Sequence, residues 1–312
     1  MDLICNYSLI GQSINMKDQK KAYGFAITAI LFWSTMSSAF KLTLEHIDTA
    51  NLLFIASVSS VFILLVINLI NGEFRSLSKL SSKHILNSAF LGALNPFAYY
   101  LILFKAYDLL QAQIAGTLNY FWPVVLVLLS IPLLKQKISY KSIIAILISF
   151  GGIMIISSEG NFSNLASDNY LGISLALGSA IFWALYWIYN VKDERSDLPK
   201  LLLNFIFGAF FITIYLIITD QFIVPTPEAI GGGVYIGFFE MGLTYFFWLK
   251  ALQYSLNTAK VSNLVYLSPF IALIIIHLTV GEQILITTFI GLIFIVGGIL
   301  LQKYIDRPAP KH

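Results

Sequence analysis

Apolar runs of about 20 residues recur along the whole chain, and this feature constrains the fold more than any other. A helix of that length rises about 30 Å, the thickness of the hydrocarbon core of a bilayer. The composition agrees, because 58% of the residues are hydrophobic and 11% are charged, whereas soluble domains have about 25% charged residues. We therefore expect an all-α integral membrane protein.

Short segments with turn residues, such as Asn71-Gly72 and Pro225-Thr226-Pro227, separate the apolar runs. Connections this short make consecutive helices antiparallel neighbours. The sequence predicts ten transmembrane helices, at residues 22–43, 50–70, 85–107, 112–134, 140–157, 170–190, 200–219, 229–252, 258–279 and 284–304.

The basic residues gather in alternate connecting segments. Of the 19 Lys and Arg residues, only Lys41 and Lys105 lie on one side of the predicted topology, and all others lie on the opposite side. Because cytoplasmic loops are enriched in Lys and Arg, we expect both termini in the cytoplasm. Residues 1–21 are then a cytoplasmic segment, and residues 305–312 are a cytoplasmic tail.

The beginning of the chain does not resemble a signal peptide, because no basic region precedes an apolar one. Met16 opens the string MKDQKK, which looks more like a natural start than the residues before it. We predict that Met16 can serve as the initiator and that residues 1–15 are dispensable. The single Cys5 excludes an intramolecular disulfide.

The second half of the chain repeats the first. The segment LGALNPFAYYLILFKAY aligns with IGFFEMGLTYFFWLKAL, so that Gly92 matches Gly237 and Tyr100 matches Tyr245. After one inserted residue, LNYFWP aligns with LVYLSP. An internal repeat of this length indicates that two copies of one structural unit build the fold.

The repeat predicts a mechanism once the helices are counted. Five helices per unit is an odd number, so the two copies cross the membrane in opposite directions. We expect one unit over residues 22–157 and the other over residues 170–304. Inverted repeats of this kind are typical of secondary transporters, whose binding site lies near the bilayer midplane between the repeats.

These features resemble the EamA branch of the drug/metabolite transporter superfamily. The resemblance rests on the ten helices in two inverted repeats, FWS in the first helix, Gly-Gly near the ends of the fifth and tenth, and VGE at Val280–Glu282. It implies transport of small molecules across a bacterial inner membrane. The strings WSTM at Trp33–Met36 and LNYFWP at Leu118–Pro123 are similar to those of bacterial aromatic amino-acid exporters, which implies export of aromatic or other neutral amino acids.

Glu240 lies near the middle of the predicted helix 229–252. A carboxylate at that depth costs roughly 3 kcal/mol, so it usually marks a substrate pathway, a proton relay or a paired polar contact. The alternative is a hydrogen-bonded glutamate that locks its helix to a neighbour. Its repeat partner Asn95 also lies at the midplane, beside Pro96, and joins the predicted pathway.

A polar patch is expected around Pro123, which frees the backbone carbonyl of Asn119. Such a patch in an apolar wall requires another helix, water or a ligand to satisfy it. We interpret Asn119 and Tyr120 as binding the polar group of a ligand, with Trp122 stacking on its apolar part. A proline kink with packed aromatic residues is the alternative. Tyr266 takes a similar position in the ninth helix.

Further aromatic residues lie well inside the predicted membrane region. Aromatic walls suit amphipathic or cationic ligands through stacking and through attraction of a cation to the ring face. Packing against lipid or against other helices is the alternative for each of them. The predicted pathway includes Trp33, Tyr99, Trp183 and Tyr186.

Glu240 and His277 are the two candidates for proton coupling. His277 lies near the outer end of the ninth helix, where a histidine close to Glu282 would respond to external pH. An interfacial or hydrogen-bonded histidine is the alternative for His277. Transport without a coupled ion is the alternative for the mechanism as a whole.

The sequence contains no Walker motif, no dinucleotide glycine fingerprint, no metal-ligand spacing and no catalytic constellation. We expect no enzyme activity, no cofactor, no metal and no nucleic-acid partner. The leading hypothesis is a secondary transporter that exports small amphipathic metabolites, such as neutral or aromatic amino acids, by alternating access. Uptake, export of another metabolite or drug, a membrane-embedded enzyme and a non-transporting scaffold are the alternatives.

Overall fold

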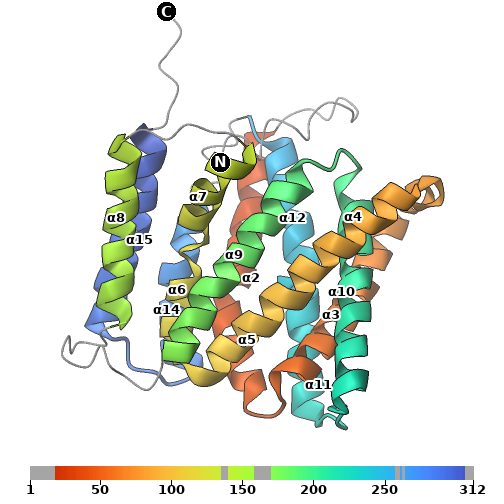
Figure 1. The fold of residues 1–312 in the computed structure, drawn as a ribbon, viewed down its shortest axis with the longest axis horizontal. Coiled ribbons are helices and arrows are strands. Elements are labelled where there is room, and N and C mark those ends of the chain that lie inside the picture. The colour runs from red at the N-terminus through yellow and green to blue at the C-terminus, as the bar shows by residue number, and fades with distance from the viewer. Residues whose placement is uncertain (1–17, 135–139, 158–169, 257–260, 262–263, 306–312) are drawn as a thin grey trace, which may run out of the picture.

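The computed structural model describes residues 18–134, 140–157, 170–256, 261 and 264–305. These residues form a bundle of helices and contain no strand (Figure 1). Six described helices are long and apolar enough to cross a membrane, and three shorter apolar helices accompany them. The all-helical prediction is confirmed for this part of the chain. The predicted start at Met16 and most of both predicted tails lie outside it.

The first half of the chain opens with two long helices and continues with helices that are interrupted. Its elements are α2 (Gln19–Leu44), α3 (Thr49–Ile70), η1 (Phe74–Lys79), α4 (Ser82–Gly92), η2 (Ala93–Ala98), α5 (Tyr99–Leu109), α6 (Ala112–Asn119), α7 (Trp122–Leu134) and α8 (Tyr140–Ser157).

The second half follows the same order of long and interrupted helices. Its elements are α9 (Tyr170–Val191), α10 (Asp197–Thr219), α11 (Pro227–Tyr235), η4 (Ile236–Glu240), α12 (Leu243–Tyr254), η5 (Leu264–Leu267), α14 (Ser268–Thr279) and α15 (Ile286–Ile305). Each of the ten predicted helix ranges therefore contains a helical segment in the part of the chain that the structure describes.

Acidic residues fix the beginnings of the first two helices. The side chain of Asp18 accepts hydrogen bonds from the backbone nitrogens of Lys20 and Lys21, at 3.0 and 3.2 Å. Asp48 does the same at the start of α3, where the backbone nitrogens of Ala50 and Asn51 lie at 2.9 and 3.0 Å. Each bond satisfies a backbone N–H that has no partner within its helix.

Two of the predicted helices contain a π-helical turn instead of continuing as α-helix. In the first, η2 separates α4 from α5, and Asn95 within it adopts an extended conformation. Pro96 has no backbone N–H to continue the α-helical ladder there. In the second, η4 separates α11 from α12, and Gly242 follows it with non-helical φ and ψ angles. A third predicted helix is divided between α6 and α7.

The helices of the two halves interlock in matching pairs. The contacts join α2 to α12 and α14, and they join α9 to α5 and α7. Between the halves, α3 also packs against α10. At one end of the bundle, α8 packs along α15, as Figure 1 shows, and both helices contact α6.

Glycines allow backbones from different halves to approach closely. A Cβ on Gly92 would lie 2.4 Å from the carbonyl oxygen of Asn204, and one on Gly237 would lie 2.4 Å from that of Ala56. Both distances are below any normal contact, so a larger residue would push α4 from α10 or η4 from α3. The two π-helical turns are thus held against opposite halves of the chain.

The pair α8 and α15 shows the same kind of contact at two levels. A Cβ on Gly152 would lie 2.5 Å from the carbonyl oxygen of Gly291, and one on Gly298 would lie 2.6 Å from that of Ala145. Small residues of this kind let two membrane helices meet backbone to backbone.

Candidate functional site

The two π-helical turns place polar side chains in the interior of the bundle. Asn95 of η2 is fully buried, and Glu240 of η4 is 7% exposed. The hydroxyl of Thr244 donates a hydrogen bond to the backbone carbonyl of Phe239, which satisfies one carbonyl that the interrupted ladder leaves free. Such turns occur often at functional sites, because they re-aim a side chain without ending the helix.

The hydrogen bonds of these two residues cross between the halves of the chain. The hydroxyl of Tyr100, on α5, donates to Oε1 of Glu240 at 2.9 Å. The amide of Asn95 donates to the hydroxyl of Tyr245, on α12, at 3.5 Å. Tyr100 matches Tyr245 in the sequence repeat and Asn95 matches Glu240, so each half contributes the same two positions and bonds them to the other half.

Trp183 of α9 lies at the centre of an aromatic cluster beside these bonds. Its ring centroid is 4.7 Å from that of Tyr99, 6.3 Å from that of Trp122 and 6.1 Å from that of Tyr245. Tyr186, one turn further along α9, lies 6.4 Å away. The structure therefore brings together four of the aromatic residues that the sequence proposed for the pathway: Tyr99, Trp122, Trp183 and Tyr186.

Asn119 is joined to the same cluster. Its side-chain oxygen accepts a hydrogen bond from the hydroxyl of Tyr99 at 3.2 Å, and its amide nitrogen donates to the hydroxyl of Ser179 at 3.0 Å. The neighbouring Tyr120 instead bonds the side chain of Ser268, on α14. Asn119 and Tyr120 therefore point to different helices.

Several buried polar atoms in this region have no hydrogen-bond partner among the described residues. They are Oε2 of Glu240, the side-chain oxygens of Asn95 and Asn204, and Nε1 of Trp183. Buried polar atoms are nearly always paired, so a group of unpaired ones marks a place where water or a ligand is expected.

Trp33 and Tyr266, two more of the predicted aromatic residues, are also partly or fully buried. Trp33 contacts Trp248, with ring centroids 5.4 Å apart. Trp248 is partly buried and packs against the core of the bundle. Tyr266 is buried in η5, next to α14.

His277 and Glu282 do not pair through their side chains. A ring nitrogen of His277 lies 2.9 Å from the backbone oxygen of Glu282, and the histidine is exposed. The carboxylate of Glu282 instead accepts hydrogen bonds from the backbone nitrogens of Ala112 and Gln113, at 2.7 and 3.1 Å. It caps the beginning of α6, which belongs to the other half of the chain.

Sequence reasoning missed Asn204 and Ser179 as part of this region. Asn204 is fully buried on α10, and its amide lies 3.5 Å from the hydroxyl of Tyr186. An asparagine within an otherwise apolar run was the available signal. Tyr100 and Tyr245 were recognised as matching positions of the repeat, but their bonds to Glu240 and Asn95 depend on which helices lie adjacent.

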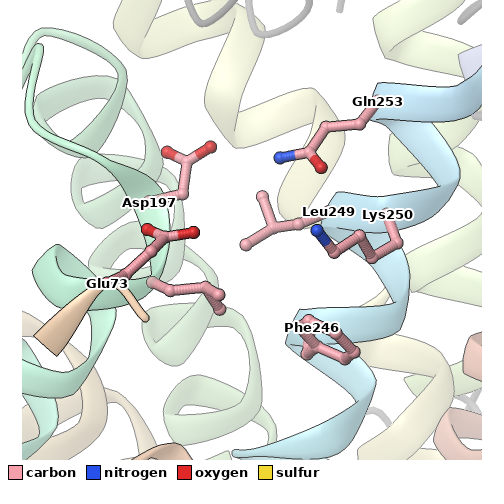
Figure 2. A pocket seen from close by; sticks show the side chains of 7 residues that line it. Glu73, Asp197, Phe246, Leu249, Lys250 and Gln253 are labelled. Atoms are coloured by element: carbon pink, nitrogen blue, oxygen red, sulfur yellow. The ribbon is translucent and has the colours of Figure 1, made fainter. Parts of the chain in front are cut away.

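A second polar group lies at the opposite end of α12 from η4. A cavity of about 10 Å³ lies within this group. Figure 2 shows Glu73 and Asp197 on one side of it and Phe246, Lys250 and Gln253 of α12 on the other. Burial raises the pKa of Glu73 above its ordinary value of 4.5, while the charge of Lys250 opposes this shift and that of Asp197 adds to it.

A buried ion pair stabilises the connection between α9 and α10. The guanidinium of Arg195 contacts the carboxylate of Asp193 and donates to the hydroxyl of Ser88 on α4 at 2.7 Å. Asn87 donates to the same carboxylate at 2.7 Å. Burial acts to raise the pKa of Asp193, but the bonds and charge of Arg195 hold it below its ordinary value.

A bundle of apolar helices, with a polar, aromatic-lined centre at two helix breaks, defines a multi-pass membrane protein of the transporter type. The chain belongs to the EamA-like transporter family, which it matches over residues 20–158 and again over residues 170–302. The family resemblance drawn from the sequence is therefore confirmed.

Relatives of nearly the same length carry similar names. An "Uncharacterized transporter" of Clostridium kluyveri is 25% identical over 93% of this chain and 95% of its own length. Another, of Archaeoglobus fulgidus, is 23% identical over 92% of this chain and 98% of its own. A solved crystal structure of a protein at 19% identity has a TM-score of 0.67 and covers 94% of this chain and 100% of that one, which shows likeness of fold.

Proposed function

We propose that this protein is a secondary transporter that exports small amphipathic metabolites, such as neutral or aromatic amino acids, by alternating access. Residues 22–157 and 170–304 are the two halves, related as inverted repeats, and both termini face the cytoplasm of a bacterial cell. The matching helix pairs support two structurally equivalent halves. The distribution of Lys and Arg supports the orientation.

One observation carries the proposal. The bonds from Tyr100 to Glu240 and from Asn95 to Tyr245 link equivalent positions of the two halves across the centre of the bundle. In an alternating-access mechanism, two similar halves exchange conformations around a central site. The two bonds at that centre are suited to such a change of conformation, because each joins the tyrosine of one half to the Asn95 or Glu240 position of the other half.

In the proposed pathway, Tyr99, Trp122, Trp183 and Tyr186 form the aromatic wall. Asn95, Asn119 and Glu240 supply the polar contacts to the substrate. Trp33, Tyr120 and Tyr266 line a neighbouring stretch. Tyr120 lies near Ser268, two residues after Tyr266, and the hydroxyl oxygen of Ser268 lies 3.1 Å from that of Ser34, next to Trp33 on α2.

For proton coupling, the geometry favours Glu240 over His277. Glu240 lies inside the central network, whereas His277 is exposed and contacts a backbone carbonyl of its own loop. A proton that drives transport must bind where it competes with the substrate or changes the pathway. His277, at the surface of α14, is not placed to do either directly.

The test is flux of labelled amino acids, aromatic ones included, in proteoliposomes at two internal pH values. Wild type is compared with Asn119→Ala and Trp122→Ala, and with Tyr170→Phe, an exposed position, as control. We expect saturable flux that both pathway variants lose and the control keeps. Absence of flux for every amino acid in folded protein would reject the amino-acid proposal and leave other metabolites to be screened.

A further inference from the structure

The central carboxylate has no cationic partner in the described chain. The three described ion pairs join Lys105 to Asp108, Arg195 to Asp193 and Lys200 to Asp197, and none includes Glu240. One carboxylate oxygen of Glu240 accepts from Tyr100, and the other has no partner. A buried carboxylate usually gains a cation or several donors to compensate for its lost hydration.

Two more unpaired acceptors belong to the same buried region, on η2 and α10. Asn95 donates to the hydroxyl of Tyr245 and Asn204 donates to that of Tyr186, and in each case the side-chain oxygen is left without a partner. The backbone carbonyl of Asn204 also lies against Gly92, immediately before η2. The central network therefore offers three unpaired acceptor atoms, of which one is part of a carboxylate.

The surrounding wall is aromatic rather than aliphatic. Tyr99 lies against both Trp183 and Tyr100, with ring centroids 4.7 Å apart in each case. Trp187 is stacked on Tyr245 at 6.3 Å. The faces of such rings attract cations, and they do so most strongly when the site is desolvated.

We propose that this centre recognises the protonated amine of an amphipathic ligand. A primary ammonium carries three N–H donors and one positive charge, which match the three unpaired acceptors and the carboxylate of Glu240. The apolar part of the ligand then packs on Trp183 and Tyr99. A ligand carboxylate finds no cationic side chain among the partners of this network. The inference deepens the proposed transport function by naming the group that the site selects.

The experiment compares three probes that share a phenyl ring and an ethyl linker: 2-phenylethylamine, phenylalanine and 3-phenylpropionate. Equilibrium binding to the purified full chain is followed by tryptophan fluorescence, because Trp183 and Trp122 lie in the site. We expect saturable binding of the amine, equal or weaker binding of the amino acid and none of the carboxylate. Binding of 3-phenylpropionate as tight as that of the amine would overturn the inference, as would absence of amine binding.

A matched pair of variants tests the role of the carboxylate. Glu240→Gln keeps the shape and removes the charge, and should weaken amine binding at least tenfold. Glu228→Gln makes the same change at the exposed start of α11 and should leave binding unchanged. Equal amine binding by Glu240→Gln and wild type contradicts the proposal. The probe comparison on wild type needs no variant, so it holds even where Glu240→Gln fails to fold.

Measurements of binding and of flux together distinguish failure of the ammonium site from failure of the proposed transport function. Selective amine binding without flux of any probe in proteoliposomes supports the site and rejects the transporter. Saturable flux of phenylalanine that 3-phenylpropionate inhibits as well as 2-phenylethylamine does supports the transporter and rejects the ammonium site.

Discussion

The hydroxyl of Tyr100 lies 2.9 Å from Oε1 of Glu240, and this hydrogen bond connects α5 of one half to η4 of the other. Tyr100→Phe removes the described donor of a buried carboxylate. We expect the variant to lose about 1–3 kcal/mol of unfolding free energy, as for other buried groups left unpaired. Thermal unfolding in detergent measures the loss. Tyr170→Phe, at an exposed position, should unfold like wild type.

Replacement of Glu240 by Gln should abolish any dependence of transport on the proton gradient, because Gln cannot bind or release a proton. Exchange of substrate at saturating concentration should persist, since the side chain keeps its shape. Exchange and net flux at two internal pH values test this. His277→Asn should leave the pH dependence as it is in wild type. A pH dependence that survives in Glu240→Gln would reject the coupling role.

Close backbone contacts predict that Gly92 and Gly237 do not tolerate a methyl group. Gly92→Ala and Gly237→Ala each place a Cβ 2.4 Å from a backbone carbonyl, and overpacking of this kind costs about 1–3 kcal/mol. Gly178→Ala is the control, because no atom lies within 4 Å of its added Cβ and α9 is helical there. We expect the control to be neutral or stabilised by up to ~1 kcal/mol. Equal unfolding midpoints for all three variants would contradict the prediction.

The ion pair between Arg195 and Asp193 is buried, with side chains 12% and 4% exposed. Arg195→Ala removes the ion-pair partner of Asp193 and leaves a largely buried carboxylate with fewer donors, which should cost about 1–3 kcal/mol. Because the pKa of Asp193 is lowered on folding, its stabilisation is present above its unfolded value of 3.8 and is lost as pH falls further. Lys105→Ala breaks an exposed pair and should change stability by less than about 1 kcal/mol. Unfolding of both variants at pH 7 distinguishes the two cases.

For Glu73 we expect a dependence of stability on pH with the opposite sign to that of Asp193. Its pKa is raised on folding, so the folded state binds the proton more tightly and stability falls as pH rises through 4.5 and the raised pKa. Glu73→Gln removes this fall. We expect the variant to unfold at a higher temperature than wild type at pH 7 and at nearly the same temperature at pH 4. A variant that is less stable than wild type at pH 7 would show that the attraction to Lys250 outweighs burial (Figure 2).

The helices were predictable because each apolar run has the length that a bilayer demands, and this signal is local. The π-helical turns were not, because they lie where Gly92 and Gly237 meet helices far along the chain, and such contacts leave no local signal. Pro96 indicated a disturbed helix near Asn95 but not its form. The depth of Glu240 follows from its place within an apolar run, so its burial was predictable.

The partners of the site residues were harder to predict. The contact of Trp33 with Trp248, and that of Asn119 with Tyr99 and Ser179, depend on which helices lie side by side. Asn204 carries no local signal beyond its polarity. The sequence repeat showed that Tyr100 and Tyr245 are equivalent, and the structure adds that each bonds the opposite half.

The backbone contacts between α8 and α15 have a mechanical consequence. Gly152 and Gly298 lie against carbonyl groups at two heights along this pair, so sliding one helix past the other drives a backbone into a backbone. We therefore expect α8 and α15, the last helices of the two halves, to move as one unit. In the proposed alternating-access mechanism, the conformational change would then take place in the remaining helices, with this pair as their support.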